Sequence, residues 1–444
     1  MIFSPRDLRN LLLPLMLEQI LTSLMGTADT MMVTTVSSSA ISAVSLVDSV
    51  NILMIQLFSA MATGGAIVSS HFIGSGSKKE ASETGRQLIL AIVTISAAIA
   101  ALCALLRGPL LSLIFGTVEA DVMEGAKVYM LVTSLSFPFL ALFSAGSALF
   151  RSCGNSRLPM RVSLISNCIN IGGNALLIFV FKMGVLGVAI PTLVSRIFSA
   201  VTVLLLLRRQ KQDIVVRDYR TIRPNFSRIR QIMRIGIPTG VENSMFQFGK
   251  LVVQSTISTM GTTAMAANAM AASLEQAATH APIAIGLGLM TIIGQCMGAG
   301  EQEQAKYYMK KLMKYSEITL IISCAVVAAL VKPITVFTGM EQEAAELAIH
   351  MTLWISFYKP FPWVFSFIPA YGMRAAGDVK FPMIVSTCTM WSCRVAITVL
   401  TATLFHVGPM AMWIGMFSDW TIRAFIFTFR LRSGKWLNHK VLHA

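Results

Sequence analysis

The stretch "PLMLEQILTSLMGTADTMMV", residues 14–33, places Glu18 and Asp29 in a run that is otherwise apolar, small or hydroxylated. A helix of about 20 such residues is long enough to cross the hydrocarbon core of a bilayer. The two carboxylates are 11 residues apart, which is three helical turns plus about 20°, so both project from one face. A carboxylate near the bilayer centre costs about 2.5–3.5 kcal/mol. We therefore expect this face to meet a water-filled cavity or a partner, not lipid.

The rest of the chain is equally apolar. Of 444 residues, 55% are hydrophobic and 13% are charged, and the mean hydropathy is +0.69. This composition predicts an all-α integral membrane protein and argues against a soluble enzyme. The first apolar run is longer than a signal-peptide core and is expected to be a retained helix. Twelve transmembrane helices are predicted near residues 10–36, 41–72, 86–106, 122–150, 158–182, 185–207, 231–260, 264–298, 312–332, 345–372, 381–405 and 408–430.

The distribution of Lys and Arg predicts the topology. The net charge is +15, but 26 of the 36 Lys and Arg residues fall in the N-terminus, the loops after even-numbered helices and the C-terminal tail. Four fall on the opposite side: Arg107, Lys127, Lys182 and Lys332. This asymmetry predicts a multi-pass protein of the cytoplasmic (inner) membrane with both termini in the cytoplasm. The basic stretch at 208–230 is then a cytoplasmic linker, and no nucleic-acid partner is expected.

The sequence also contains an internal repeat. A shift of 224 residues aligns Pro14 with Pro238 and Glu18 with Glu242, and after a one-residue slip Arg151 aligns with Arg374. We therefore predict an N-terminal six-helix lobe at 1–207, the linker at 208–230, a C-terminal six-helix lobe at 231–430 and a cytoplasmic tail at 431–444. Because each lobe has an even number of helices, a pseudo-two-fold axis along the membrane normal should relate them. Two such bundles enclosing a cleft are typical of secondary transporters, although channels and flippases also contain bundled repeats.

The intramembrane acids differ between the two halves. Glu18 has its counterpart in Glu242, whereas Asp29 falls opposite Val253 and Asp48 falls opposite Ala272. A charge present in one copy is more plausibly tied to a specific binding event than a charge kept in both. Asp29 is therefore the first candidate for binding a coupling ion. The alternative is that it is a structural partner for a buried hydroxyl or backbone group.

A second polar set lies in the fifth and sixth predicted spans. Asn170 and Asn174 are four residues apart on one helical face, and Thr192 follows Pro191. Neutral amides and a hydroxyl supply oxygen atoms for a cation without adding charge. Asn residues also join membrane helices structurally, so both interpretations stay open.

These residues and motifs resemble the multidrug and toxic compound extrusion (MATE) transporters of prokaryotes over essentially the whole chain. The resemblance rests on "ADTMMV" after Pro14, "GSGSKKEA", "RSCGNSRLP" and "NCINIGGN" in the first half. In the second half it rests on "GIPTGVENSMFQFGK", "GQCMGAGEQEQA" and "RAAGDVKFP". It implies an antiporter with two six-helix lobes that exports bulky, often cationic drugs or toxic metabolites in exchange for H⁺ or Na⁺.

The resemblance also implies roles for single residues. The coupling Asp, Asn and hydroxyl residue of the family match Asp29, Asn170 and Thr192, and its helix-bending proline matches Pro14. Asn174 stands where related members commonly carry Asp, which puts sodium coupling at this site in doubt. Phe246 stands where another branch carries a carboxylate in the second half.

The predicted class of substrate depends on four acidic residues. Glu18, Asp48, Glu242 and Glu275 are the candidate residues of the substrate cleft, and their charge suits cationic organic molecules. Arg196 and Asp419 align in the repeat and are predicted to form a structural ion pair. Apart from the coupling ion, no cofactor or metal is expected. Membrane lipid surrounds the protein, which is expected to function as a monomer.

Other classes of function fit the sequence less well. A lipid-linked saccharide flippase is the main alternative, but its cleft should be rich in Arg or Lys for pyrophosphate. An enzyme is not expected, because the sequence has no HExxH, no GxSxG and no clustered His. An ion channel fits poorly, because the halves are unequal and no filter-like loop is present.

Overall fold

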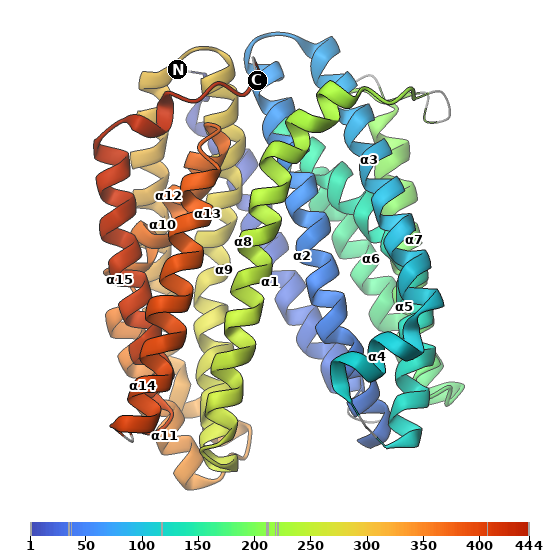
Figure 1. Ribbon diagram of the computed structural model, residues 1–444, viewed down its shortest axis with the longest axis vertical. Coiled ribbons are helices and arrows are strands. Elements are labelled where there is room, and N and C mark those ends of the chain that lie inside the picture. Colours follow the sequence, from blue (N-terminus) through green and yellow to red (C-terminus); the bar gives the residue numbers. More distant parts are fainter. Residues whose placement is uncertain are drawn as a thin grey trace. The chain divides into compact units, whose positions relative to one another are not determined.

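The computed structural model describes residues 2–33, 36, 38–116, 119–209, 213–217, 219, 222–405 and 407–442. Within its helices, the side chains of Met25, residues 27–30, Val33 and Ser38 lie outside this description. The described residues form helices and connecting loops, with no strand among them (Figure 1). The predicted all-helical class is confirmed.

Several helices carry charged residues at their ends that suit the helix dipole. Acidic residues lie in the first turns of α3, α5, α10 and α11, and arginines lie in the last turns of α5, α12 and α15. Both placements oppose the helix dipole. The first half contains α1 (Pro5–Val33), α2 (Ser38–Gly74), α3 (Lys78–Leu105), α4 (Arg107–Phe115), α5 (Ala120–Ser152), α6 (Arg157–Ala175), the π-helix η1 (Leu176–Val180) and α7 (Leu186–Leu207). The remainder contains α8 (Phe226–Ser258), α9 (Thr262–Gly298), α10 (Gln302–Phe337), α11 (Gln342–Tyr358), α12 (Trp363–Ala375), α13 (Lys380–Thr389), the π-helix η3 (Met390–Val395), α14 (Ala396–Leu404), α15 (Met410–Arg432) and the short 3₁₀-helix η4 (Lys435–Leu437).

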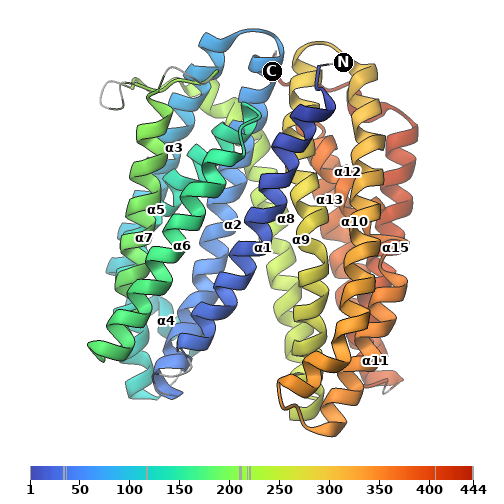
Figure 2. The ribbon, with the colours of Figure 1, turned by 180° about the vertical axis from the view of Figure 1, so that it is seen from behind.

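The chain divides into two compact units. The N-terminal unit is residues 3–240, and the C-terminal unit is residues 241–444 together with residues 1–2. The division falls inside α8, close to Pro238. In the N-terminal unit α5 packs against α2, α3 and α7, and α1 packs against α6 (Figure 2). In the C-terminal unit α9 packs against α10, α11 and α12, and α15 packs against α12 and α14.

The internal repeat of the sequence is visible in the conformation of the glycines that follow equivalent helices. Gly76 (φ +79°) and Gly300 (φ +77°) follow the second long helix of each half, α2 and α9, in a left-handed conformation. Gly154 (φ +76°) in "RSCG" and Gly377 (φ +96°) in "RAAG" follow α5 and α12 in the same conformation. Such φ values cost little only for glycine. The glycines aligned by the sequence shift therefore have the same conformation in both halves.

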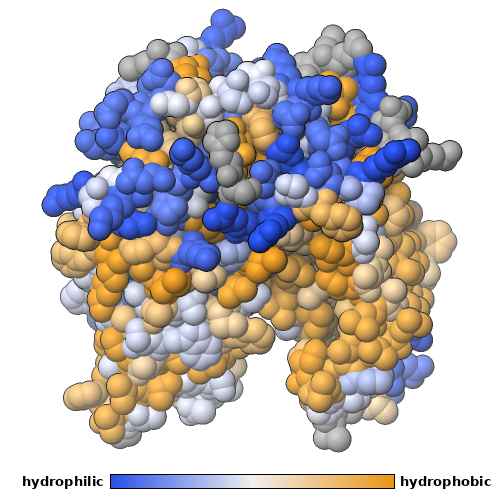
Figure 3. Space-filling model, turned by 45° about the horizontal axis from the view of Figure 1, so that its top comes forward, coloured by the Kyte–Doolittle hydropathy of each residue, from blue (hydrophilic) through white to orange (hydrophobic). Residues whose placement is uncertain are grey.

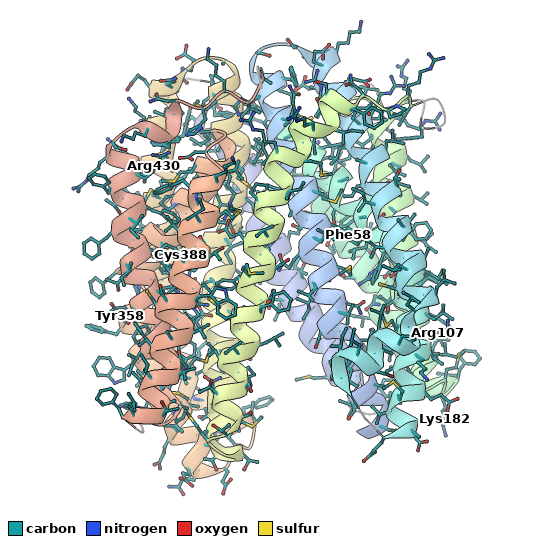
Figure 4. All side chains as sticks on the ribbon, in the orientation of Figure 1. Phe58, Arg107, Lys182, Tyr358, Cys388 and Arg430 are labelled. Atoms are coloured by element: carbon teal, nitrogen blue, oxygen red, sulfur yellow. The ribbon has the colours of Figure 1, made fainter. Side chains whose placement is uncertain are left out.

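Eight helical segments are long and apolar enough to cross a membrane by length and composition, among the residues that the structure describes. The other predicted spans lie in α1, α8, α11–α12 and α15. On each unit the side faces of the helices are covered by hydrophobic residues, and hydrophilic residues gather at one end (Figure 3). Arg107 and Lys182 lie at the opposite end of the N-terminal unit from the α2–α3 connection (Figure 4).

Two local details differ from the sequence prediction. The span at 345–372 is not one helix, because α11 ends at Tyr358 and α12 begins at Trp363. Pro360 and Pro362 explain the break, since each lacks an N–H and disfavours helical geometry in the residue before it. The short helix α4 was not predicted. Its nine residues lie between the predicted spans at 86–106 and 122–150.

Candidate functional site

The predicted amides and hydroxyl of the N-terminal unit lie together. Asn170 donates from Nδ2 to Thr192 Oγ1 at 3.1 Å, and Asn174 donates from Nδ2 to Asn170 Oδ1 at 3.4 Å. Thr192 in turn donates to the carbonyl of Val188 at 3.0 Å. Asn174 is fully buried. The structure therefore joins α6 and α7 through a continuous polar chain of Asn170, Asn174 and Thr192, which we call the amide site.

Close packing of α6 and α7 makes the amide site possible. A Cβ atom on Gly173 would lie 2.8 Å from Cβ of Pro191, so only a residue without a side chain fits there. Two residues after Asn174, α6 continues as the π-helix η1. A π-helical turn is rare and changes the direction of the side chains that follow it, and it occurs often at functional sites.

α1 brings Pro14 and Asp29 to this unit. Pro14 lies within α1, where it removes one backbone donor. Asp29 also lies in α1, which packs against α6, but its side chain lies outside the described residues. The structure therefore places the helix that carries Asp29 beside α6. The role of Asp29 in binding a coupling ion stays a prediction.

The two neighbouring glycines of α6 offer a matched test of the amide site. Gly173→Ala should destabilise the protein by about 1–3 kcal/mol, because the added methyl overlaps Pro191 and pushes α6 from α7. Gly172→Ala meets no atom within 4 Å and should be neutral, or stabilising by up to about 1 kcal/mol through higher helix propensity. Thermal unfolding of both variants in detergent measures the difference. Equal stability of the two variants would contradict the described packing.

Glu18 and Glu242, the pair kept in both halves, are each attracted by an arginine of their own unit. Glu242 Oε1 lies 2.8 Å from Arg374 Nη2 in a largely buried ion pair. The Glu18 carboxylate, at the corresponding position, is attracted by Arg151, the counterpart of Arg374. In both units an acid on the first helix of the half thus meets an arginine in the last turn of a neighbouring helix, α5 or α12.

Asp48 also has a local network. Its Oδ1 accepts from Asn51 Nδ2 at 3.0 Å and from the Tyr129 hydroxyl at 3.4 Å. Arg196, which donates to Ser136 Oγ at 2.6 Å, adds an electrostatic attraction to the Asp48 carboxylate. The network joins α2, α5 and α7. Sequence reasoning did not find Tyr129 or Arg196 as partners of Asp48, because they come from distant segments of the chain.

Glu275 is the acid of α9, and its partner is Lys359. The Lys359 ammonium forms an ion pair with Glu275 Oε1 and donates to the Glu275 carbonyl at 2.9 Å. Lys359 is fully buried and lies over the rings of Trp363 and Trp420, 5.5 and 5.9 Å from their centroids. Two of the predicted cleft acids, Glu242 and Glu275, therefore form ion pairs, and the other two are attracted by an arginine of the same unit.

The predicted ion pair between Arg196 and Asp419 is wrong. Asp419 is fully buried and forms ion pairs with Arg394 at 3.0 Å and with Arg423 at 2.7 Å. Arg423 also donates to Thr389 Oγ1 at 3.2 Å. Positions aligned in a repeat occupy equivalent places in different units, and equivalence does not make them neighbours.

The described residues contain no group of three or more His, Cys, Asp or Glu side chains arranged to hold a metal ion.

Cys153 follows the last residue of α5, and burial raises the pKa of this thiol to about 12. A thiol with that pKa is almost entirely protonated at neutral pH and is a poor nucleophile.

Comparisons with known proteins agree over nearly the whole chain. The MatE family model matches residues 14–176 and 238–400. An uncharacterized transporter YisQ of Bacillus subtilis is 29% identical over 96% of this chain and 93% of its own length. A probable multidrug resistance protein NorM of Thermotoga maritima is 26% identical over 98% of this chain and 94% of its own. A solved outward-facing multidrug resistance MATE family transporter of the MOP superfamily matches with a TM-score of 0.90 at 15% identity, over 97% of this chain and 96% of that one.

Proposed function

Since the chain belongs to the MatE (MATE) family of multi-pass membrane transporters, which are not enzymes, we propose that it is a secondary antiporter. It exports bulky organic compounds in exchange for H⁺ or Na⁺ by alternating access. The match in fold to a MATE transporter and the matched halves at 14–176 and 238–400 support this proposal. They also support twelve spans in two six-helix bundles related by an axis along the membrane normal. The excess of Lys and Arg in alternate loops supports cytoplasmic termini.

The observation that carries the proposal is the amide site. Its amide and hydroxyl oxygens lie on α6 and α7, and α1, which carries Asp29, packs against α6. We propose that Asp29 takes up the coupling ion beside this site and releases it on the other side of the membrane. The neighbouring oxygens would bind Na⁺ or accept hydrogen bonds from the protonated acid. Burial of the acid without its ion is costly, and this cost would couple ion occupancy to the conformation of the transporter.

We propose a broader class of substrates than the cationic molecules that the four predicted cleft acids suggested. Glu242 and Glu275 form ion pairs and Glu18 and Asp48 are attracted by arginines, so these bases offset the negative charge that the four acids would offer a cation. Organic cations stay proposed substrates through the family relationship, not through these four residues. The names of relatives such as the probable multidrug resistance protein NorM support bulky organic substrates in general.

Transport by purified protein in liposomes tests the proposal. A cationic dye should cross against its gradient when a pH gradient or a Na⁺ gradient is imposed, and not when both are dissipated. Testing each gradient separately identifies the coupling ion. If neither gradient drives transport of any cationic, neutral or anionic dye tested, the antiporter proposal fails.

A further inference from the structure

The C-terminal unit carries cations on the helices that correspond to α1 and α6. By the repeat, α8 corresponds to α1, and the segment formed by α13 and η3 corresponds to α6. Lys250 falls opposite Gly26, and Arg394 falls opposite Ile171, the neighbour of Asn170. Two positions that are neutral in the first half are therefore basic in the second.

Lys250 and Arg394 converge on one aromatic ring. The Lys250 ammonium lies 5.2 Å from the centroid of the Phe246 ring, and Cζ of Arg394 lies 4.8 Å from the same centroid. A Cβ on Gly249 would lie 2.3 Å from Met390 Cε, so α8 and η3 pack in direct contact. The extra residue of the π-helix η3 sets the direction of Arg394. We call Phe246, Lys250 and Arg394 the cationic site.

The acids of the C-terminal unit do not balance the cationic site. Asp419 is shared between Arg394 and Arg423, and Glu275 is paired with Lys359. Arg394 is 3% exposed, and its Nε has no hydrogen-bond partner among the described residues. Arg394 repels the Lys250 ammonium, and Glu275, which attracts it, is already paired with Lys359.

Lys250 has no acidic partner of its own. It forms no ion pair with a described acid, and although the residue as a whole is exposed, its ammonium lies beside an aromatic ring. An ammonium, a buried guanidinium with an unpartnered N–H and a phenyl ring are groups that bind an aromatic anion: the cations bind the acidic group, and the ring packs against the aromatic part.

We propose that the cationic site binds the anionic group of aromatic or amphipathic organic acids, such as a carboxylate or sulfonate, as substrates of the transporter. This inference rests on the proposed export function and assigns it a second class of substrate. The two units then differ in charge preference, with the amide site serving the coupling cation and the cationic site serving the cargo anion.

A pair of dyes with one skeleton and opposite charge tests this. Fluorescein is anionic and rhodamine 123 is cationic at neutral pH, and both contain a xanthene ring. Fluorescence polarisation with purified protein should show that Lys250→Gln weakens fluorescein binding about tenfold, the loss of about one charge-assisted contact. Lys250→Glu should weaken it further. Rhodamine 123 binding should change less than about twofold in both variants.

Lys314→Gln is the matched control, because Lys314 is an exposed lysine of α10 in the same unit. It should leave fluorescein binding unchanged. Failure of the wild-type protein to bind fluorescein, or equal affinities of wild-type and both Lys250 variants, would overturn the cationic site. Export of rhodamine 123 from liposomes tests the antiporter proposal separately from fluorescein binding. If export fails, fluorescein binding by the wild type and the Lys250 variants still decides whether the cationic site exists.

Discussion

Replacing Asp29 with asparagine should reduce gradient-driven export to the passive leak of protein-free liposomes. An asparagine has nearly the same shape as the acid but neither ionises nor carries the charge that binds a cation, so the proposed exchange step cannot occur. The helix that carries Asp29 packs against α6, the helix of Asn170 and Asn174. Dye export under an imposed pH or Na⁺ gradient measures the effect.

The matched control for Asp29→Asn is Asp121→Asn, at an exposed acid in the first turn of α5. It should export dye at the wild-type rate. Thermal unfolding of purified Asp29→Asn should match that of the wild type, which separates lost coupling from lost folding. Export by a folded Asp29→Asn variant at the wild-type rate would refute the role given to Asp29.

Replacing Asp419 with asparagine should have the largest effect on stability, a loss of about 3–5 kcal/mol. Asp419 is fully buried and is the ion-pair partner of both Arg394 and Arg423. The neutral amide leaves two buried guanidinium groups without a counter-charge, and neither can lose its proton near neutral pH. Denaturant or thermal unfolding in detergent, followed by fluorescence of the buried Trp413 and Trp420, measures the loss.

The control for Asp419→Asn is Asp213→Asn. Asp213 lies 2.6 Å from Lys78 in a pair whose side chains are 35% and 70% exposed. Exposed ion pairs contribute about 0–1 kcal/mol, so this variant should unfold close to the wild type. A similar small effect for both variants would show that the Asp419 cluster is hydrated in the native protein, and would contradict its described burial.

Much of the fold could be predicted because its signals are local. Apolar runs identify the helices, and the shift of 224 residues aligns glycines that prove to have the same left-handed conformation, Gly76 and Gly300. The contact between Asn170 and Asn174 follows from their spacing of four residues on one helix. Thr192 joins them because α7 returns antiparallel beside α6, which a short connection between two spans already favours.

The partners of the charged residues could not be predicted, because ion pairs depend on which helices become neighbours. Nothing near Asp48 in the sequence indicates Arg196, and Asp419 has Arg394 as a partner only because α15 packs against η3. A π-helix inserts one residue into a helical turn, so the direction of Arg394 cannot be read from a regular 3.6-residue period. For this reason the sequence predicted four acids that attract a cation, but it did not predict the basic residues that lie near them.

The matched acid–arginine positions, Glu242 with Arg374 and Glu18 with Arg151, have a consequence for the history of the gene. A feature found in both halves is inherited most simply from the single ancestral segment that was duplicated, so the acid–arginine pair predates the fusion of the two copies. Lys250 and Arg394 have no basic counterparts in the first copy, so the two copies have diverged at these positions since the duplication. The acid–arginine arrangement is therefore older than this difference in charge between the halves.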